Sequence, residues 1–138
     1  MTRIFLDTNI FLRFLIPEDK TTFQHCQLIF EKAKSGSFIP FISDIVLQEI
    51  IYVLKTTYKF PREKIINTIK KISQIRNIVI VEKTDISQAL DIYYKYNIKF
   101  GDCLIATQIP KGATLCSYDK DFSTLPFLSV APPSKIIE

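Results

Sequence analysis

The sequence predicts a single α/β domain with helices on both faces of a central parallel sheet of four or five strands. Short apolar runs, typical of buried strands, lie at 3–6, 38–42, 77–81, 113–117 and 127–130. Helical patterns separate most of these runs, which favours right-handed crossover connections between parallel strands. A chain of 138 residues without an internal repeat or a linker suits one compact domain.

Helices are predicted where apolar residues recur at helical spacing, over 9–16, 20–34, 43–57, 61–76, 84–96 and 102–110. Gly36 ends the second of these helices, Ser43 is suited to cap the third, and Pro61 is suited to open the fourth. Thr84 is expected to cap the fifth. Helices and strands therefore alternate along almost the whole chain.

Pro40 lies inside the second predicted strand. Proline has no backbone N–H group, so it removes one hydrogen bond from the ladder of a central strand. We therefore expect this strand to be short or to lie at an edge of the sheet.

The composition favours a folded, intracellular protein. Apolar residues make up 47% of the chain and charged residues 23%, which argues against a disordered or fibrous protein. A net charge of +4 is a mild preference for anionic partners. Three cysteines without a C-x-x-C pair, and one histidine, argue against a disulfide framework, a zinc site or a Ser-His-Asp triad. No apolar run approaches the roughly 20 residues that cross a bilayer, so we expect a soluble, cytoplasmic protein with no membrane contact.

Two aspartates lie where predicted strands end. Asp7 directly follows the run at 3–6, and Asp119 lies just past the run at 113–117. Ligands of open parallel sheets bind outside the carboxyl ends of the strands, so these two side chains are expected to face one crevice. Capping of a following helix or turn explains each of them equally well.

Two further acids lie in helical segments. Glu49 has apolar residues one helical turn away on either side, which places its carboxylate on or beside a buried face. A buried carboxylate needs a partner, and a salt bridge and a metal ion are the two alternatives. Asp102 opens the apolar run CLIA, where a helix cap or first turn explains it and also aims it into the same crevice.

Four segments of the chain together resemble the acidic motifs of PIN domains. They are FLDTNIFL at 5–12, ISDIVLQEIIYVL at 42–54, IKFGDCLIAT at 98–107 and LCSYDKDF at 115–122. No single segment is specific, but their order, spacing and local chemistry match over nearly the whole chain. The resemblance is narrower to the VapC-type toxins of bacterial and archaeal toxin–antitoxin pairs, and it implies one PIN domain over 1–138.

The resemblance implies a role for each matching residue. The four positions that bind metal and catalyse in the family correspond here to Asp7, Glu49, Asp102 and Asp119. The polar positions that help to orient ligands or water correspond to Thr8, Asn9 and Ser117. Asp121 matches an auxiliary acid of many members, although a cap for the turn at Phe122 explains it at least as well.

A shared acidic pocket has a direct chemical consequence. Carboxylates in one pocket raise one another's pKa unless a cation holds them ionised. Oxygen ligands suit Mg²⁺ or Mn²⁺, which can polarise a phosphoryl oxygen and activate water. The resemblance implies an endoribonuclease that hydrolyses RNA phosphodiester bonds and leaves a 3′-hydroxyl and a 5′-phosphate.

The helices also suggest surfaces for RNA and protein partners. The segment 55–76 carries seven Lys and Arg against one Glu, which favours phosphate contacts, although a solvated helix face explains any single residue as well. The candidate RNA-binding residues are Arg13, Lys55, Lys59, Arg62, Lys64, Lys70 and Lys71. The resemblance implies a homodimer that binds a cognate antitoxin, and the apolar helices at 45–58 and 61–76 are the expected surfaces.

Other functions compete with this interpretation. A housekeeping PIN-domain nuclease that processes RNA differs from a toxin mainly in genetic context. A phosphatase or phosphotransfer enzyme with Asp7 as nucleophile would require a second Asp two residues later, where this chain has Asn9. A non-catalytic binding module with the same fold is disfavoured by the acids at all four positions.

Overall fold

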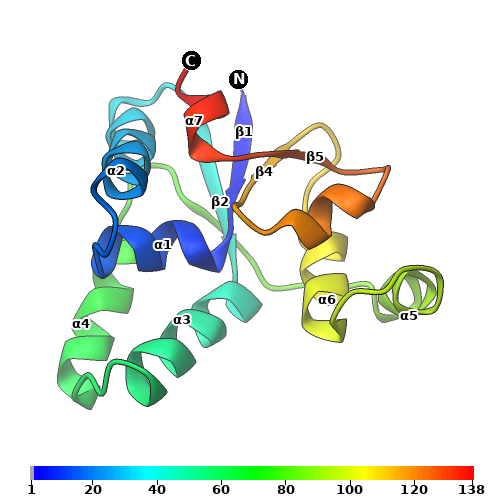
Figure 1. The fold of residues 1–138 in the computed structure, drawn as a ribbon, viewed down its shortest axis with the longest axis horizontal. Helices are drawn as coiled ribbons and strands as arrows, with labels where there is room; N and C mark the ends of the chain where they lie inside the picture. The colour runs from blue at the N-terminus through cyan, green and yellow to red at the C-terminus, as the bar shows by residue number, and fades with distance from the viewer. Residues whose placement is uncertain (1) are drawn as a thin grey trace.

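A computed structural model describes residues 2–138, and a parallel sheet runs through its centre (Figure 1). The sheet has five strands in the order β3-β2-β1-β4-β5, and every neighbouring pair is parallel. The strands are β1 (Arg3–Leu6), β2 (Ile39–Ser43), β3 (Val79–Val81), β4 (Thr114–Cys116) and β5 (Ser129–Ala131). The predicted α/β class and its central parallel sheet are confirmed.

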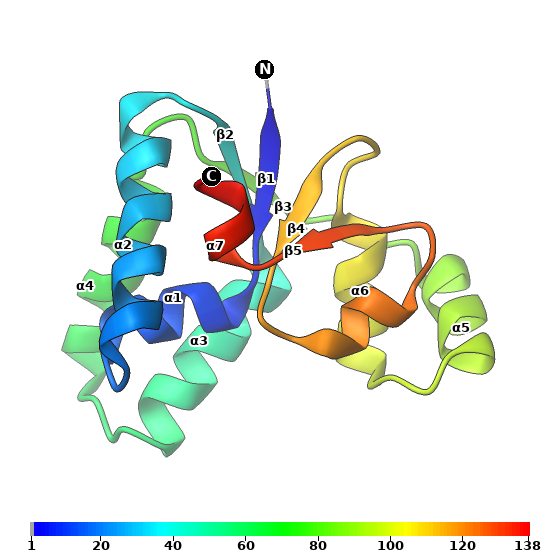
Figure 2. The ribbon, with the colours of Figure 1, turned by 45° about the horizontal axis from the view of Figure 1, so that its top comes forward.

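Helices lie on both sides of this sheet, as predicted. Figures 1 and 2 show α1, α2, α4 and α7 on one side and α5 and α6 on the other, while α3 runs below the carboxyl ends of the strands. The helices are α1 (Thr8–Leu15), α2 (Lys20–Ser35), α3 (Asp44–Thr56), α4 (Arg62–Ser73), α5 (Ile86–Lys95), α6 (Phe100–Gln108) and α7 (Pro133–Ile136). The short α7 and a 3₁₀ helix, η1 (Lys120–Thr124), were not predicted from the sequence.

The winding of the sheet determines where a ligand can bind. From β1 the chain adds β2 and β3 on one side, then crosses over to add β4 and β5 on the other. The strand order therefore reverses between β1 and β4. In open α/β sheets such a reversal leaves a crevice at the carboxyl ends of the two strands.

Most helix ends follow the sequence signals. Gly36 has a left-handed φ of 83° and ends α2, and the N–H of Ser37 donates to the carbonyl of Lys32 at 2.9 Å. The hydroxyl of Ser43 caps α3 by accepting from the N–H of Val46 at 3.1 Å.

The predicted cap at Thr84 is wrong by one residue. Asp85 is the N-cap of α5, and its carboxylate accepts from the N–H of Gln88 at 3.0 Å. An Asp caps a helix at least as well as a Thr, so the adjacent acid takes the position.

The predicted edge position of the strand with Pro40 is also wrong, because β2 pairs with β1 on one side and β3 on the other. The N–H of Ile39 donates to the carbonyl of Thr2, on the β1 side. Backbone groups alternate along a strand, so the nitrogen of Pro40 faces the β3 side. Pairing with β3 begins only at Phe41, and the missing donor therefore removes no ladder bond.

The core lies between the sheet and the helices. Phe5 and Leu6 of β1, Ile42 of β2 and Leu115 of β4 have no exposed surface. The three cysteines are free and buried, and they pack as small apolar side chains. Among residues 2–138, no helix is long and apolar enough to cross a membrane.

Candidate active site

Asp7 lies at the carboxyl end of β1 and caps α1. Its Oδ1 accepts from the N–H of Thr8 at 2.8 Å, and its Oδ2 accepts from the hydroxyl of Ser117 at 2.6 Å and the amide of Asn9 at 3.3 Å. The side chain is only 5% exposed. Burial raises the pKa of Asp7, the hydrogen bonds from Ser117 and Thr8 oppose the rise, and the charge of Asp119 adds to it.

A hydrogen-bond network ties the ends of β1 and β4 together. The buried hydroxyl of Ser117 donates to Asp7 and accepts from the N–H of Asp119 at 2.9 Å. The amide oxygen of Asn9 accepts from the N–H of Tyr118 at 3.3 Å. Ser117 and Asn9 therefore fix the carboxylate of Asp7 relative to the segment that carries Asp119.

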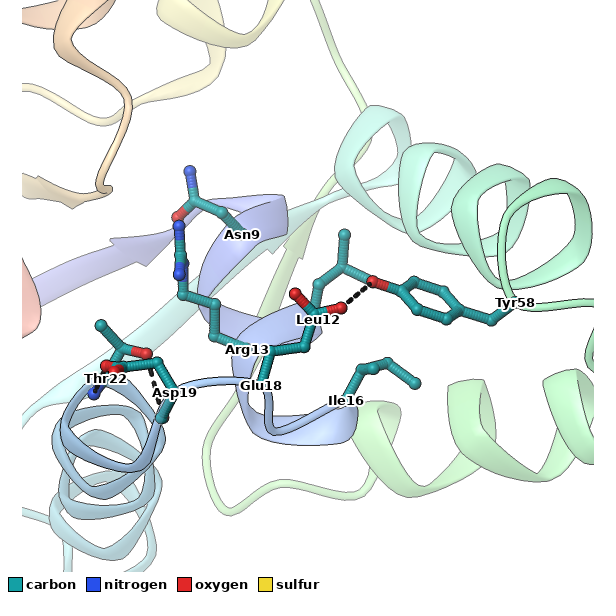
Figure 3. A pocket seen from close by; sticks show the side chains of 8 residues that line it. All are labelled: Asn9, Leu12, Arg13, Ile16, Glu18, Asp19, Thr22 and Tyr58. Carbon is teal, nitrogen blue, oxygen red and sulfur yellow. Dashed lines mark hydrogen bonds between the residues drawn. The ribbon is translucent and has the colours of Figure 1, made fainter.

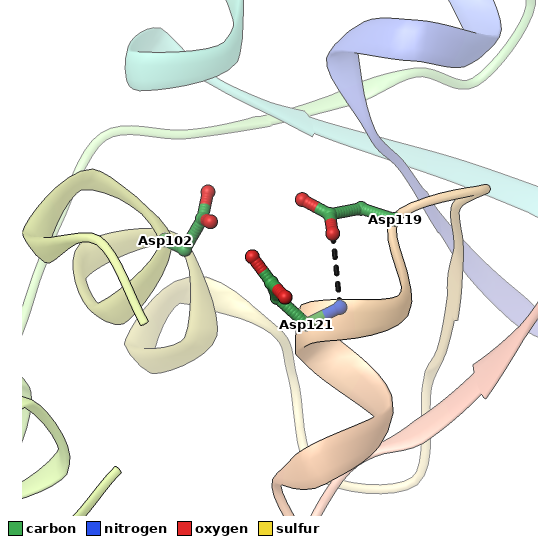
Figure 4. Close-up of side chains that lie close together, drawn as sticks. All are labelled: Asp102, Asp119 and Asp121. Carbon is green, nitrogen blue, oxygen red and sulfur yellow. Dashed lines mark hydrogen bonds between the residues drawn. The ribbon is translucent and has the colours of Figure 1, made fainter. Parts of the chain in front are cut away.

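Three aspartates from two other elements meet beside this network (Figure 4). Asp119 caps η1 by accepting from the N–H of Asp121 at 2.9 Å, and Asp102 lies in the first turn of α6. One carboxylate oxygen from each of Asp102, Asp119 and Asp121 lies within 4.8 Å of the others. The capping role expected as an alternative for Asp119 is real, and it aims the carboxylate at Asp102.

The carboxylate of Asp102 has fewer hydrogen-bond partners than its burial requires. It is 5% exposed, and its Oδ2 is buried without a hydrogen-bond partner among the described residues. Burial raises the pKa of Asp102 to about 6, with Lys99 opposing and Asp119 adding to the rise. An unpartnered buried carboxylate oxygen is costly unless a cation binds to it.

Glu49 projects from α3 toward the same pocket but is only half-buried. Its Oε1 accepts from the hydroxyl of Thr8 at 3.1 Å. Burial raises the pKa of Glu49, the Thr8 bond lowers it, and the charge of Asp7 raises it further. Among residues 2–138, the salt bridge that is present joins Lys135 to Glu138 and does not involve Glu49. The alternative that Glu49 pairs with Lys or Arg is therefore wrong.

The structure therefore brings the predicted acids together unequally. Asp102 and Asp119 form the tight cluster with Asp121, the acid predicted only as an auxiliary. Asp7 and Glu49 lie outside this spacing but close enough to raise the pKa of Asp102. All five carboxylates thus face one region at the carboxyl ends of β1 and β4.

Lys99 is a residue of this site that the sequence interpretation missed. It precedes α6 directly and is exposed, and its charge lowers the pKa of Asp7, Glu49 and Asp102. Its position three residues before Asp102 was the available signal, because the side chains at the N-cap and N3 positions of a helix lie close together.

Arg13 lines a separate pocket of about 220 Å³ (Figure 3). Its guanidinium carbon is 4.8 Å from the ring centroid of Tyr118. Asn9 lines the same pocket, as does Tyr58, whose hydroxyl donates to Glu18 at 3.0 Å.

The other predicted RNA-binding cations lie away from the acids. Those six residues, all exposed, are Lys55, Lys59, Arg62, Lys64, Lys70 and Lys71. The ammonium of Lys64 lies 4.0 Å from the ring centroid of Phe60. Two of them, Lys55 and Arg62, lie at an apolar groove of about 290 Å³ between α3 and α4, which we call the α3–α4 groove and which is lined by Ile51, Lys55, Phe60, Arg62, Ile65 and Ile66. Lys71 lines a different pocket, beside Phe11 and Phe14.

Comparison with known proteins places this geometry in a family. The family model described as "PIN domain" matches residues 4–128. A VapC ribonuclease of Aquifex aeolicus (strain VF5) is 29% identical over 129 residues, which cover 92% of this chain and 95% of that protein.

Two solved structures share the fold at lower identity. One is the crystal structure of VapBC2 from Rickettsia felis bound to a DNA fragment from their promoter, with a TM-score of 0.68, 20% identity, and 95% and 98% of the two chains covered. The other is Mycobacterium tuberculosis VapC20, described as a Sarcin-Ricin loop cleaving toxin, with a TM-score of 0.70, 18% identity, and 94% and 99% covered.

Proposed function

The chain belongs to the PIN domain family, and from that premise we propose that it is a metal-dependent endoribonuclease, the VapC-type toxin of a toxin–antitoxin pair. One observation carries the proposal. Three carboxylates lie within 4.8 Å of one another, and one of them, Asp102, has a buried oxygen without a partner. The curated relative, a VapC ribonuclease, supports the activity.

The donor set fits a hard divalent cation. Asp102, Asp119 and Asp121 offer oxygen atoms only, and Mg²⁺ and Mn²⁺ prefer carboxylate oxygens together with water. Among residues 2–138, no cysteine belongs to this cluster. We therefore assign Asp102 and Asp119 as metal ligands, with Asp121 as a third and with Asp7 and Glu49 placed to contribute.

The chain's own residues prepare the reaction. When bound, the metal ion supplies charge that polarises a phosphoryl oxygen and lowers the pKa of water. Ser117, Thr8 and Asn9 hold the carboxylate of Asp7 in one orientation. The Oε1 of Glu49 accepts a hydrogen bond from the hydroxyl of Thr8, so its Oε2 is free to accept one from the attacking water. The products are a 3′-hydroxyl and a 5′-phosphate.

Substrate and partner binding complete the proposal. Arg13 lines a pocket with Asn9, and Lys99 lines another with Asp121, so both are placed to contact RNA phosphates. Lys55 and Arg62 of the α3–α4 groove would extend this contact. The apolar groove itself is our candidate surface for the second copy of a homodimer or for the antitoxin.

The competing phosphotransfer function is disfavoured by the surroundings of Asp7. Both of its oxygens accept hydrogen bonds, and the side chain is 5% exposed. A carboxylate held in this way is poorly placed to attack phosphorus. A housekeeping role in RNA processing would be separated from a toxin role by the absence of a neighbouring antitoxin gene.

The test is cleavage of RNA by the purified protein with Mg²⁺ or Mn²⁺, with EDTA, and after Asp7→Asn. We expect cleavage only with metal and a large loss in the variant, because a carboxylate next to the metal is removed. Glu31→Gln, an exposed acid on α2, is the matched control and should cleave normally. Cleavage that survives both EDTA and Asp7→Asn would refute the mechanism.

A further inference from the structure

A second hollow adjoins the acid cluster at the end of α5 and the start of α6. It has a volume of about 620 Å³, and its lining includes Tyr93, Asn97, Lys99, Phe100 and Asp121. Asp121 also belongs to the aspartate cluster, so one side chain forms a wall of both. A molecule that fills this hollow therefore lies next to the proposed metal.

Two aromatic rings in the lining of the hollow are exposed. Tyr93 is 54% and Phe100 36% exposed. Their ring centroids are 5.6 Å apart with an interplanar angle of 84°, so the two rings meet edge to face. This contact holds both rings in place, and exposed, fixed aromatic rings are surfaces on which nucleic-acid bases stack.

The lining of the hollow also includes a cation. Lys99 precedes Phe100 directly and lines the same hollow. Its charge lowers the pKa of Asp7, Glu49 and Asp102, so its ammonium group acts on the acid pocket as well. A positive charge beside an aromatic platform fits a nucleotide, which joins an anionic phosphate to a flat base.

We infer that Tyr93, Lys99 and Phe100 form a nucleotide subsite that binds one unpaired base of the RNA next to the scissile phosphate. This inference rests on the proposed ribonuclease function. The base stacks on Phe100 and Tyr93. Lys99 contacts the phosphate between this nucleotide and its neighbour, beside the metal. Bases inside a duplex are already stacked and paired, so the subsite selects single-stranded or looped RNA.

The hollow is a better site for RNA than for a protein partner. An apolar protein side chain bound there would leave Lys99 without an anionic partner, and an acidic one would meet the carboxylate of Asp121, which the hollow shares with the aspartate cluster. The α3–α4 groove, lined mostly by apolar side chains, offers a protein partner a surface away from the acids.

The test compares Phe100→Ala with Tyr94→Ala on a single-stranded RNA oligonucleotide. Tyr94 is the matched control because it is 90% exposed, lies next to Tyr93, and is absent from the lining of the hollow. Loss of a stacked base should raise KM about tenfold in Phe100→Ala with kcat within about twofold, whereas Tyr94→Ala should match the wild type. Phe100→Trp should restore KM, since it keeps a stacking surface.

A binding measurement separates failure of this inference from failure of the proposed function. Fluorescence anisotropy of the same RNA in EDTA requires no catalysis, and the affinity of Phe100→Ala should also fall about tenfold. Unchanged RNA affinity and KM in Phe100→Ala, or equal cleavage of the oligonucleotide and its duplex by the wild type, overturns the subsite. Unchanged RNA affinity with a shift from dimer to monomer assigns the hollow to a protein partner and also overturns it.

Discussion

The acid pocket, formed by Asp7, Glu49, Asp102, Asp119 and Asp121, and the α3–α4 groove lie on two sides of helix α3. The pocket buries charged side chains, whereas the groove exposes apolar ones. Glu49 of α3 points to a pocket in which Asp7 and Asp102 are each only 5% exposed. Ile51, two residues later, lines a groove in which Ile66 is 46% exposed. Buried charges and exposed apolar side chains both cost free energy in the isolated chain.

The difference indicates what each region needs. Like charges gathered around buried carboxylates require a cation, whereas an exposed apolar groove requires another surface. Departures from ordinary folding rules gather at functional sites, because function is what maintains them against their cost. Changes among these acids should therefore affect catalysis and metal binding, and changes in the apolar lining of the groove should affect association.

The largest effect is expected from Asp102→Asn on RNA cleavage. The substitution keeps the shape of the side chain but removes the charge whose Oδ2 lacks a partner. We expect the rate to fall at least about a hundredfold, because loss of a ligand should exceed the 10- to 100-fold effect of losing a residue behind a ligand. Single-turnover cleavage measures it, and a loss below tenfold would remove Asp102 from the catalytic set.

The same substitution should make the metal-free protein more stable at neutral pH. Burial raises the pKa of Asp102 to about 6 in the folded protein, above its value in the unfolded chain. Wild-type stability from this group is complete below about pH 4 and is lost as pH rises through 6, by about 3 kcal/mol. Thermal unfolding in EDTA should give a higher Tm for Asp102→Asn at pH 7.5 and little difference at pH 4. A lower Tm for the variant at pH 7.5 would contradict this account.

A smaller effect is expected from Ser117→Ala. The change removes the 2.6 Å bond to Asp7 and the acceptor for the N–H of Asp119. We expect cleavage about tenfold slower, because Asp7 loses its fixed orientation while the acids remain. Ser117→Thr keeps the hydroxyl and should retain most activity. Equal rates for the Ala and Thr variants would show that the hydroxyl does not position Asp7.

The smallest effect on catalysis is expected in the α3–α4 groove. Ile66→Asp places a charge in the groove and should leave cleavage within about twofold and stability within about 0.5 kcal/mol, since the side chain is already exposed. Light scattering and antitoxin capture should show loss of a partner. The control is Asn67→Asp, which adds the same charge outside the lining. Unchanged dimerisation and antitoxin capture in Ile66→Asp would exclude the groove as an interface.

The sequence predicted the site acids at strand ends more directly than the acid whose role depends on tertiary contacts. Asp7 and Asp119 follow from strand ends, and the structure brings both to the reversal between β1 and β4. Asp102 was supported mainly by the family resemblance, because a first helical turn explains an Asp equally well. Only the fold reveals its unpartnered oxygen.

The role of Lys99 and the central position of β2 could not be predicted from a local sequence pattern. Lys99 is one of 18 Lys and Arg residues, and nothing but its spacing from Asp102 distinguishes it in the sequence. The central position of β2 depends on where β3 begins relative to Pro40, which is a matter of register between strands. Both require knowledge of which segments meet in space.

The most direct test of the acid pocket as a metal site is a calorimetric titration of Mn²⁺ into the wild type, Asp102→Asn and Glu31→Gln at pH 7.5. The structure predicts binding to the wild type and to Glu31→Gln with the same Kd, because Glu31 is exposed on α2. Asp102→Asn should bind at least about tenfold more weakly, since it removes the carboxylate that the cation would neutralise. Equal affinity in all three proteins would contradict the assignment of this pocket as the metal site.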